Sequence, residues 1–95
     1  MKLVILSQAS DELQDGVEYY EGEQLGLGER LWDEVDVALR WIEENSTLPR
    51  LRSGGYRRIN LKVFPYYIAY TISGDAIVIL AIAHSARMPD HWNKS

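Results

Sequence analysis

The chain has 95 residues, of which 46% are hydrophobic and 11% aromatic, and its formal net charge is −4. A chain of this length and composition buries one modest core, so we expect a single domain over residues 1–95 and exclude general disorder. The lack of cysteine excludes disulfides, thiolate zinc sites and a cysteine nucleophile. The apolar runs are too short for a signal peptide or a membrane helix, so we expect a cytoplasmic protein without membrane contact.

The charges divide unevenly between the two halves of the chain. Residues 1–48 hold three basic and twelve acidic side chains, a local charge of −9, whereas residues 49–95 hold seven basic and two acidic ones, a local charge of +5. Such asymmetry indicates a charged partner, although acids on solvent-facing helices and bases on strands produce the same pattern. The total charge argues against long-range attraction to phosphate, but it does not exclude a locally basic working face.

Residues 1–48 predict a strand followed by two helices. A β-rich run at residues 2–6 precedes Ser7, which we expect to cap a helix that ends at Gly22 or Gly26. One face of this helix has apolar residues at helical spacing, namely Ala9, Leu13, Val17 and Tyr20. The second helix begins near Leu27 and closes at Asn45, and its buried stripe comprises Leu27, Leu31, Val35, Ala38, Leu39 and Ile42. Their Gly-x-Gly connection predicts an antiparallel hairpin.

Two apolar residues of the second helix lie off its buried stripe. At about 100° per residue, Val37 and Trp41 project well away from the stripe, whereas Trp32 borders it. Such a pair covers a loop or docks a partner helix, and tryptophan is enriched among interface anchors. We therefore treat Val37 and Trp41 as candidate partner-binding residues.

Residues 49–95 predict three strands and a short terminal helix. From residue 56 the period is two, with Ile59, Leu61 and Val63 facing one way, until Pro65 interrupts the run. A strand at residues 66–72 and a turn at 73–75 lead to an apolar run at 76–83, which is typical of a central strand buried on both faces. After a loop at 84–87, Pro89 is expected to open a short helix that ends near Trp92. The predicted order is β-α-α-β-β-β.

The best chemical cluster in the sequence is basic and lies in the second half. Its candidate catalytic residues are Arg58 and Lys62 on one predicted strand face, His84 and Arg87 at the end of the central strand, and His91. Guanidinium groups stabilise charge that develops on a phosphodiester, and histidine moves protons near neutral pH, so the cluster fits metal-independent RNA cleavage. The alternative is a solvated strand face with two structural histidines.

No cofactor and no metal are expected from the motifs. Gly26 and Gly28 lack the third glycine of a dinucleotide fingerprint and do not follow a strand, and no phosphate-binding loop is present. His84 and His91 stand seven residues apart without a nearby ligand at helical spacing, which argues against a metal site.

Three strings together resemble the RelE/ParE superfamily of type II toxin-antitoxin toxins. They are FPYYIAY at residues 64–70, AIVILAIAH at 76–84 and RMPDHW at 87–92. The resemblance spans nearly the whole chain, because residues 7–20 and 26–34 are similar to the family's two helices and residues 55–58 to the entry of its second strand. It implies an α+β fold in which a helical hairpin packs on a small twisted, antiparallel-rich sheet.

The resemblance also implies a toxin that a small cognate antitoxin wraps and neutralises, and with which it forms an oligomer. The candidate partner-binding residues are then Val37, Trp41, Arg57, Arg58 and Trp92. ParE-like members poison DNA gyrase, whereas RelE-like members cut mRNA in the ribosome. The acidic balance and the terminal pattern favour gyrase, and RelE-like mRNA cleavage is the alternative. His91 stands where many relatives have tyrosine. A non-toxic, antitoxin-binding relative is a third possibility.

Overall fold

The helices and strands follow the predicted order β-α-α-β-β-β and form an α+β fold. The structure, a computed structural model, describes residues 1–86. Its elements are β1 (Lys2–Ile5), α1 (Ser7–Glu23), α2 (Leu27–Glu44), β2 (Arg57–Asn60), β3 (Tyr66–Ser73) and β4 (Ala76–His84). The short terminal helix predicted after Pro89 lies outside the described residues. No helix within residues 1–86 is long and apolar enough to cross a membrane.

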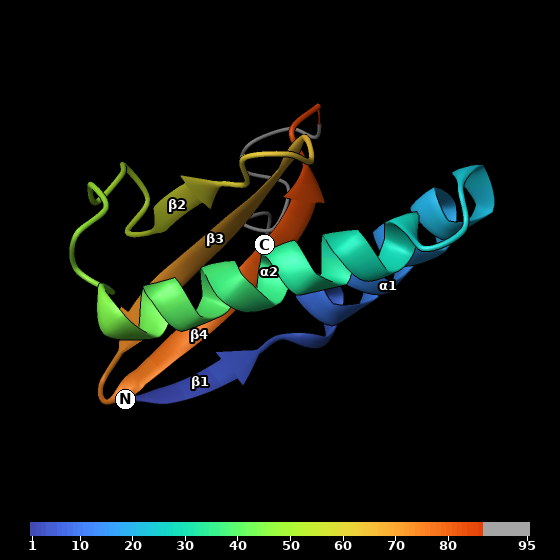
Figure 1. Cartoon of the computed structure of the whole chain (residues 1–95). Helices are drawn as coiled ribbons and strands as arrows, with labels where there is room; N and C mark the ends of the chain where they lie inside the picture. Colours follow the sequence, from blue (N-terminus) through green and yellow to red (C-terminus); the bar gives the residue numbers. More distant parts are fainter. Residues whose placement is uncertain (87–95) are drawn as a thin grey trace.

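The strands form one sheet in the order β1-β4-β3-β2 (Figure 1). β4 pairs with β3 in antiparallel and with β1 in parallel orientation, and β2 pairs with β3 in antiparallel orientation. The apolar run of the fourth strand is therefore central, as its sequence predicts, because a strand flanked on both sides meets little solvent. β1 and β2 are the edges of this sheet.

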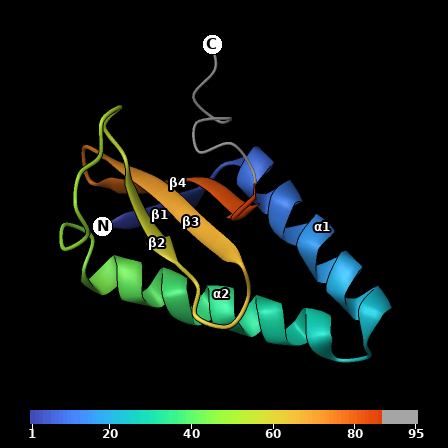
Figure 2. The ribbon, with the colours of Figure 1, turned by 90° about the horizontal axis from the view of Figure 1, so that it is seen from above.

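Both helices pack on the same face of the sheet (Figure 2). The buried stripe of α2 and the first face of α1 meet inward-facing strand residues in one core, which includes Ala9, Leu13, Leu31, Val35, Leu39, Ile42, Phe64, Tyr66, Ile68, Tyr70, Ile77, Ile79 and Ile82. A smaller cluster of Tyr67, Ala69, Ala81 and Ala83 lies on the opposite face. The alternation of cluster membership along β3 follows from the two-residue period of a strand.

A β-bulge in β4 changes which residues face the helices. Ala69 is opposite Ala81 but Tyr70 is opposite Ile79, so Leu80 is the extra residue. Before the bulge the odd-numbered residues of β4 face the core, and after it the even-numbered ones do. His84, at the end of β4 and opposite Tyr66, consequently lies on the helix-covered side of the sheet.

The ends of the helices differ from the glycine and serine caps predicted. Ser7 is the first helical residue, and the cap position belongs to Leu6, which provides no side-chain hydrogen bond. Neither glycine ends α1, which runs to Glu23, whereas Gly26 is left-handed (φ 88°) immediately before α2. The Glu21 carboxylate from α1 accepts hydrogen bonds from the Gly26 and Gly28 amides at 2.9 and 3.0 Å, so one side chain fixes the hairpin connection.

Candidate functional site

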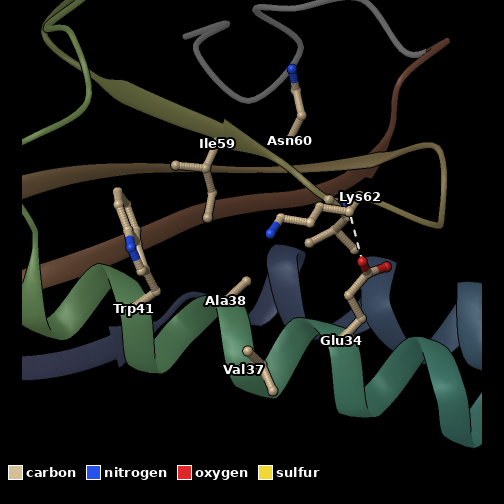
Figure 3. Close-up of a pocket in the computed structure, with 8 residues that line it drawn as sticks. Glu34, Val37, Ala38, Trp41, Ile59, Asn60 and Lys62 are labelled. Atoms are coloured by element: carbon tan, nitrogen blue, oxygen red, sulfur yellow. Dashed lines mark hydrogen bonds between the residues drawn. The ribbon is translucent and has the colours of Figure 1, made fainter.

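An apolar groove of about 420 Å³ runs between α2 and the edge strand β2. We call it the α2–β2 groove, and its lining residues are Glu34, Val37, Ala38, Trp41, Ile59, Asn60, Leu61 and Lys62. Figure 3 shows Trp41 rising from α2 and Ile59 reaching from β2 toward the same space. The helix contributes positions i, i+3, i+4 and i+7, which share one helical face.

The α2 side of the groove includes the two residues that the helical pattern placed off the buried stripe. Val37 is 67% exposed and Trp41 is 37% exposed, and both line the groove. Trp32 is 52% exposed on the same helix and does not line it. The groove therefore presents apolar surface to solvent, which is unusual unless a partner covers it.

Glu34 fixes the loop that closes the groove. Its carboxylate accepts hydrogen bonds from the backbone N–H groups of Lys62 at 3.0 Å, Val63 at 3.0 Å and Phe64 at 3.2 Å. The first of these is drawn in Figure 3. Because these N–H groups point to α2, they are not available for hydrogen bonds with β3. The strand β2 therefore ends at Asn60 and does not continue to residue 63. The prediction that Val63 continues one strand face with Ile59 and Leu61 is wrong for this reason, and the Val63 side chain is 70% exposed.

The outer edge of β2 carries backbone groups that point away from the sheet. Leu61 donates its N–H to the Tyr66 carbonyl, so along β2 the backbone N–H and C=O groups of every second residue point toward β3. The Tyr56 carbonyl faces outward and accepts from Arg52, and the alternation places Arg58 and Asn60 outward as well. No strand within residues 1–86 pairs with β2 on this side beyond the Tyr56 bridge.

The two arginines of β2 point to opposite faces of the sheet. The Arg58 guanidinium lies 4.1 Å above the Tyr67 ring centroid, on the face away from the helices, and its Nε donates to Asn60 Oδ1 at 3.2 Å. Arg57 Nε donates to the Pro49 carbonyl at 3.0 Å. Cation–π stacking of Arg58 accounts for its half-buried state despite its charge.

The candidate catalytic residues are not brought to one place within residues 1–86. His84 is on the helix-covered side, with its ring edge-to-face with Tyr66 at 5.5 Å, and its Nδ1 accepts from the Ala86 N–H at 3.0 Å. Arg58 is on the opposite face, and Lys62 lies beyond the end of β2 against α2 and does not share the strand face of Arg58 as predicted. The candidates Arg87, His91 and Trp92 lie outside the described residues. Within residues 1–86, no three histidine, aspartate or glutamate side chains are grouped for a metal.

Glu34 is the residue of this region that the sequence patterns did not single out. Its spacing of three from Val37 and seven from Trp41 is the available signal, because these positions share a helix face. In the sequence, Glu34 looks like any other acidic residue on a solvent-facing helix. Only the structure distinguishes it, because its carboxylate accepts a hydrogen bond from the Lys62 N–H, 28 residues later.

Comparison with known proteins places this architecture among the toxins of type II toxin-antitoxin systems. A solved structure described as the chromosomal ParDE TA system from P. aeruginosa has the same fold, with a TM-score of 0.66 and 20% sequence identity, covering 88% of this chain and 95% of that chain. Toxin ParE2 of Mycobacterium tuberculosis, from strains CDC 1551 / Oshkosh and ATCC 25618 / H37Rv, is 30% identical over 92 residues, covering 94% of this chain and 86% of the relative.

The model of the family described as "ParE toxin of type II toxin-antitoxin system, parDE" matches residues 3–89. The chain therefore belongs to the ParE toxin family. The resemblance to RelE/ParE toxins that the sequence strings indicate is confirmed, and the matched residues include both walls of the α2–β2 groove.

Proposed function

We propose that this protein arrests growth by inhibiting DNA gyrase and is neutralised by a cognate antitoxin with which it forms an oligomer. The observation that carries the proposal is the match of the ParE toxin family over residues 3–89. The separation of Arg58 from His84 across the sheet supports a toxin that acts by binding, because proton transfer and phosphate stabilisation require groups within reach of one scissile bond.

The gyrase proposal is tested with purified protein in a DNA supercoiling assay. Inhibition at micromolar concentration is expected, and preincubation with the antitoxin should restore supercoiling. The antitoxin is sought as the product of a short open reading frame beside this gene that rescues growth. Unchanged supercoiling at micromolar toxin, with the same preparation arresting growth on expression, would exclude gyrase as the target.

The ribonuclease alternative has a separate readout. RelE-like cleavage predicts cut mRNA in a translating extract, with much less cutting by Arg87→Ala or His91→Ala variants. Intact transcripts together with inhibited gyrase support the proposal, whereas ribosome-dependent cuts overturn it. Controlled expression without a growth defect, with soluble protein present, identifies a non-toxic relative.

We place the antitoxin in the α2–β2 groove, because the groove joins exposed apolar surface to a basic residue. Val37 and Trp41 offer apolar contact and Lys62 lines the groove with them, whereas Arg58 lies on the other face of the adjoining strand; both bases belong to the chain segment with local charge +5. The antitoxin segment expected here is amphipathic, with apolar residues toward Trp41 and acidic residues toward the bases. Its backbone can also pair with the outward groups of Arg58 and Asn60.

Trp41→Ala is expected to weaken the antitoxin complex by about thirtyfold or more, since a buried tryptophan anchor contributes about 2 kcal/mol or more. Trp32→Ala is the matched control, because Trp32 is exposed on the same helix but outside the groove. Isothermal titration calorimetry with the purified antitoxin gives both affinities. Equal losses of antitoxin affinity in the two variants would show that the interface lies outside the groove.

Reversing the charges of Arg58 and Lys62 to glutamate tests the electrostatic part of the contact. The double variant should bind the antitoxin more weakly, and the difference from wild type should shrink as salt is raised, because exposed charges are screened within about 8 Å at physiological ionic strength. Unchanged affinity at low salt would show that the basic residues lie outside the interface.

A further inference from the structure

A second concave region lies at the end of β4, away from the α2–β2 groove. It consists of a cavity of about 400 Å³ and a smaller one of about 140 Å³, and we call the pair the Tyr66 pocket because Tyr66 and His84 line both. The larger cavity is completed by Tyr19, Tyr20, Glu23 and Leu27, and the smaller one has Glu12, Asp15 and Gly16 among its walls. None of these residues belongs to the α2–β2 groove.

Tyr66 brings a hydroxyl group into this pocket without a partner for it. The side chain is only 8% exposed, and its hydroxyl makes no hydrogen bond within residues 1–86. Gly16 leaves the space beside it, since a Cβ at this position would lie 2.6 Å from the Tyr66 hydroxyl oxygen. Burial raises the pKa of Tyr66 above its ordinary value, so the hydroxyl stays protonated at neutral pH and keeps its lone pairs for a donor. The hydroxyl oxygen is not sealed from solvent, so a ligand group that donates to it replaces water.

The walls of the pocket favour positive charge. Glu12 and Asp15 are close enough to raise the pKa of Tyr66 further, and Glu23 stands at the other side. Glu12 also accepts the Ile82 N–H at 3.1 Å, which anchors α1 to the sheet. Within residues 1–86, no lysine or arginine lines either cavity. The described walls therefore favour a cation over phosphate and other anions.

The walls are also aromatic, which selects among cations. Tyr19 is 62% exposed and lies edge-to-face with Tyr20 at 5.1 Å, and the Tyr20 and Tyr66 rings are 6.2 Å apart. A planar guanidinium stacks on such rings and donates several hydrogen bonds at once, whereas an ammonium is a compact, strongly hydrated charge. Stacking surface, carboxylates and an unpartnered hydroxyl together match arginine better than lysine.

We propose that the Tyr66 pocket receives an arginine side chain of a protein partner. Its guanidinium donates hydrogen bonds to the Tyr66 hydroxyl and to the Asp15 carboxylate, and its plane stacks on the exposed Tyr19 ring and meets the Tyr20 ring edge-on. The acidic side chains of the site come from α1, so it recruits a basic surface, whereas the α2–β2 groove recruits an acidic segment. The proposal does not depend on gyrase being the target.

The test uses blocked arginine, N-acetyl-arginine amide, as the probe on the full-length protein. Nuclear magnetic resonance of the His84 and tyrosine ring signals should show saturable shifts at millimolar probe. N-acetyl-citrulline amide has the same shape without the charge and should bind about tenfold more weakly, as should the lysine analogue. Equal shifts from arginine and citrulline, or tighter binding of lysine, would overturn the proposal.

Two variants assign the binding to this pocket. Tyr66→Phe keeps the ring and removes the hydroxyl, and Asp15→Asn removes one carboxylate charge from an exposed helix position. Each should weaken the arginine probe by about tenfold or more, the effect of one hydrogen bond to a charged group. Asp75→Asn is the matched control, because it removes the same charge at the opposite end of β4, about 25 Å away. Wild-type affinity in both pocket variants would refute the assignment, and Asp15→Asn remains decisive if Tyr66→Phe fails to fold.

Discussion

Glu34→Ala should destabilise the fold more than a substitution at any fully exposed position of α2, because it releases three backbone amides at once. Hydrogen bonds to a charged acceptor contribute about 1.5–3 kcal/mol each. The three do not add, because the amides of Lys62 and Val63 are exposed and water replaces the carboxylate there. Only the Phe64 amide is partly buried and loses its partner without full compensation. We therefore expect a loss of about 2 kcal/mol in the free energy of unfolding.

For a chain of this length that loss lowers the melting temperature by about 8–16 °C. Urea unfolding followed by circular dichroism measures the free energy directly. Glu43→Ala is the control, since Glu43 is exposed on the same helix and its side chain makes no hydrogen bond within residues 1–86. It should change stability by less than about 0.5 kcal/mol. If both variants lose the same free energy, the carboxylate does not hold the loop and the account of why β2 ends at Asn60 fails.

The remaining predictions concern close packing and pH. Gly28→Ala should lower the free energy of unfolding by about 3 kcal/mol, because the added Cβ would meet the Val17 carbonyl of α1. Gly22→Ala, which has open space around it, should raise the free energy of unfolding by about 0.5–1 kcal/mol. Equal effects of the two variants in thermal melts would contradict the close approach of α1 and α2 at Gly28. Burial raises the pKa of Tyr66 and of Tyr70, so the folded state holds protons that the unfolded state releases above about pH 10. Stability should fall as pH rises beyond that value, and less steeply in a variant with both tyrosines changed to phenylalanine.

The element order could be predicted from the sequence because its signals are local. The helical stripe of α2 and the apolar run of β4 depend on spacing within one element, and both were confirmed. The end of β2 could not be predicted, because it depends on a carboxylate 28 residues earlier. The prediction that Ser7 caps α1 was also wrong. Leu6 donates its backbone N–H to the Ile79 carbonyl of β4 and takes the cap position itself, so Ser7 is already helical.

The site was harder to predict because it depends on which face each residue takes. A strict period of two places the residues of β4 on fixed faces, but the bulge at Leu80 shifts His84 to the side opposite the one that Arg58 occupies. One extra residue thus separated a constellation that strand spacing had joined. Val37 and Trp41 were found from spacing alone, because α2 has no such irregularity.

The parallel pairing of β1 with β4 has a consequence for synthesis of the chain. Lys2 pairs with Ala76, 74 residues later, so β1 leaves the ribosome well before β4, the strand with which it pairs. The β3–β4 hairpin on which both helices pack also comes late. An incomplete chain therefore cannot assemble either concave surface, and translation that stops before β4 yields a product without them. The two concave surfaces should therefore form together, once β4 has been synthesised.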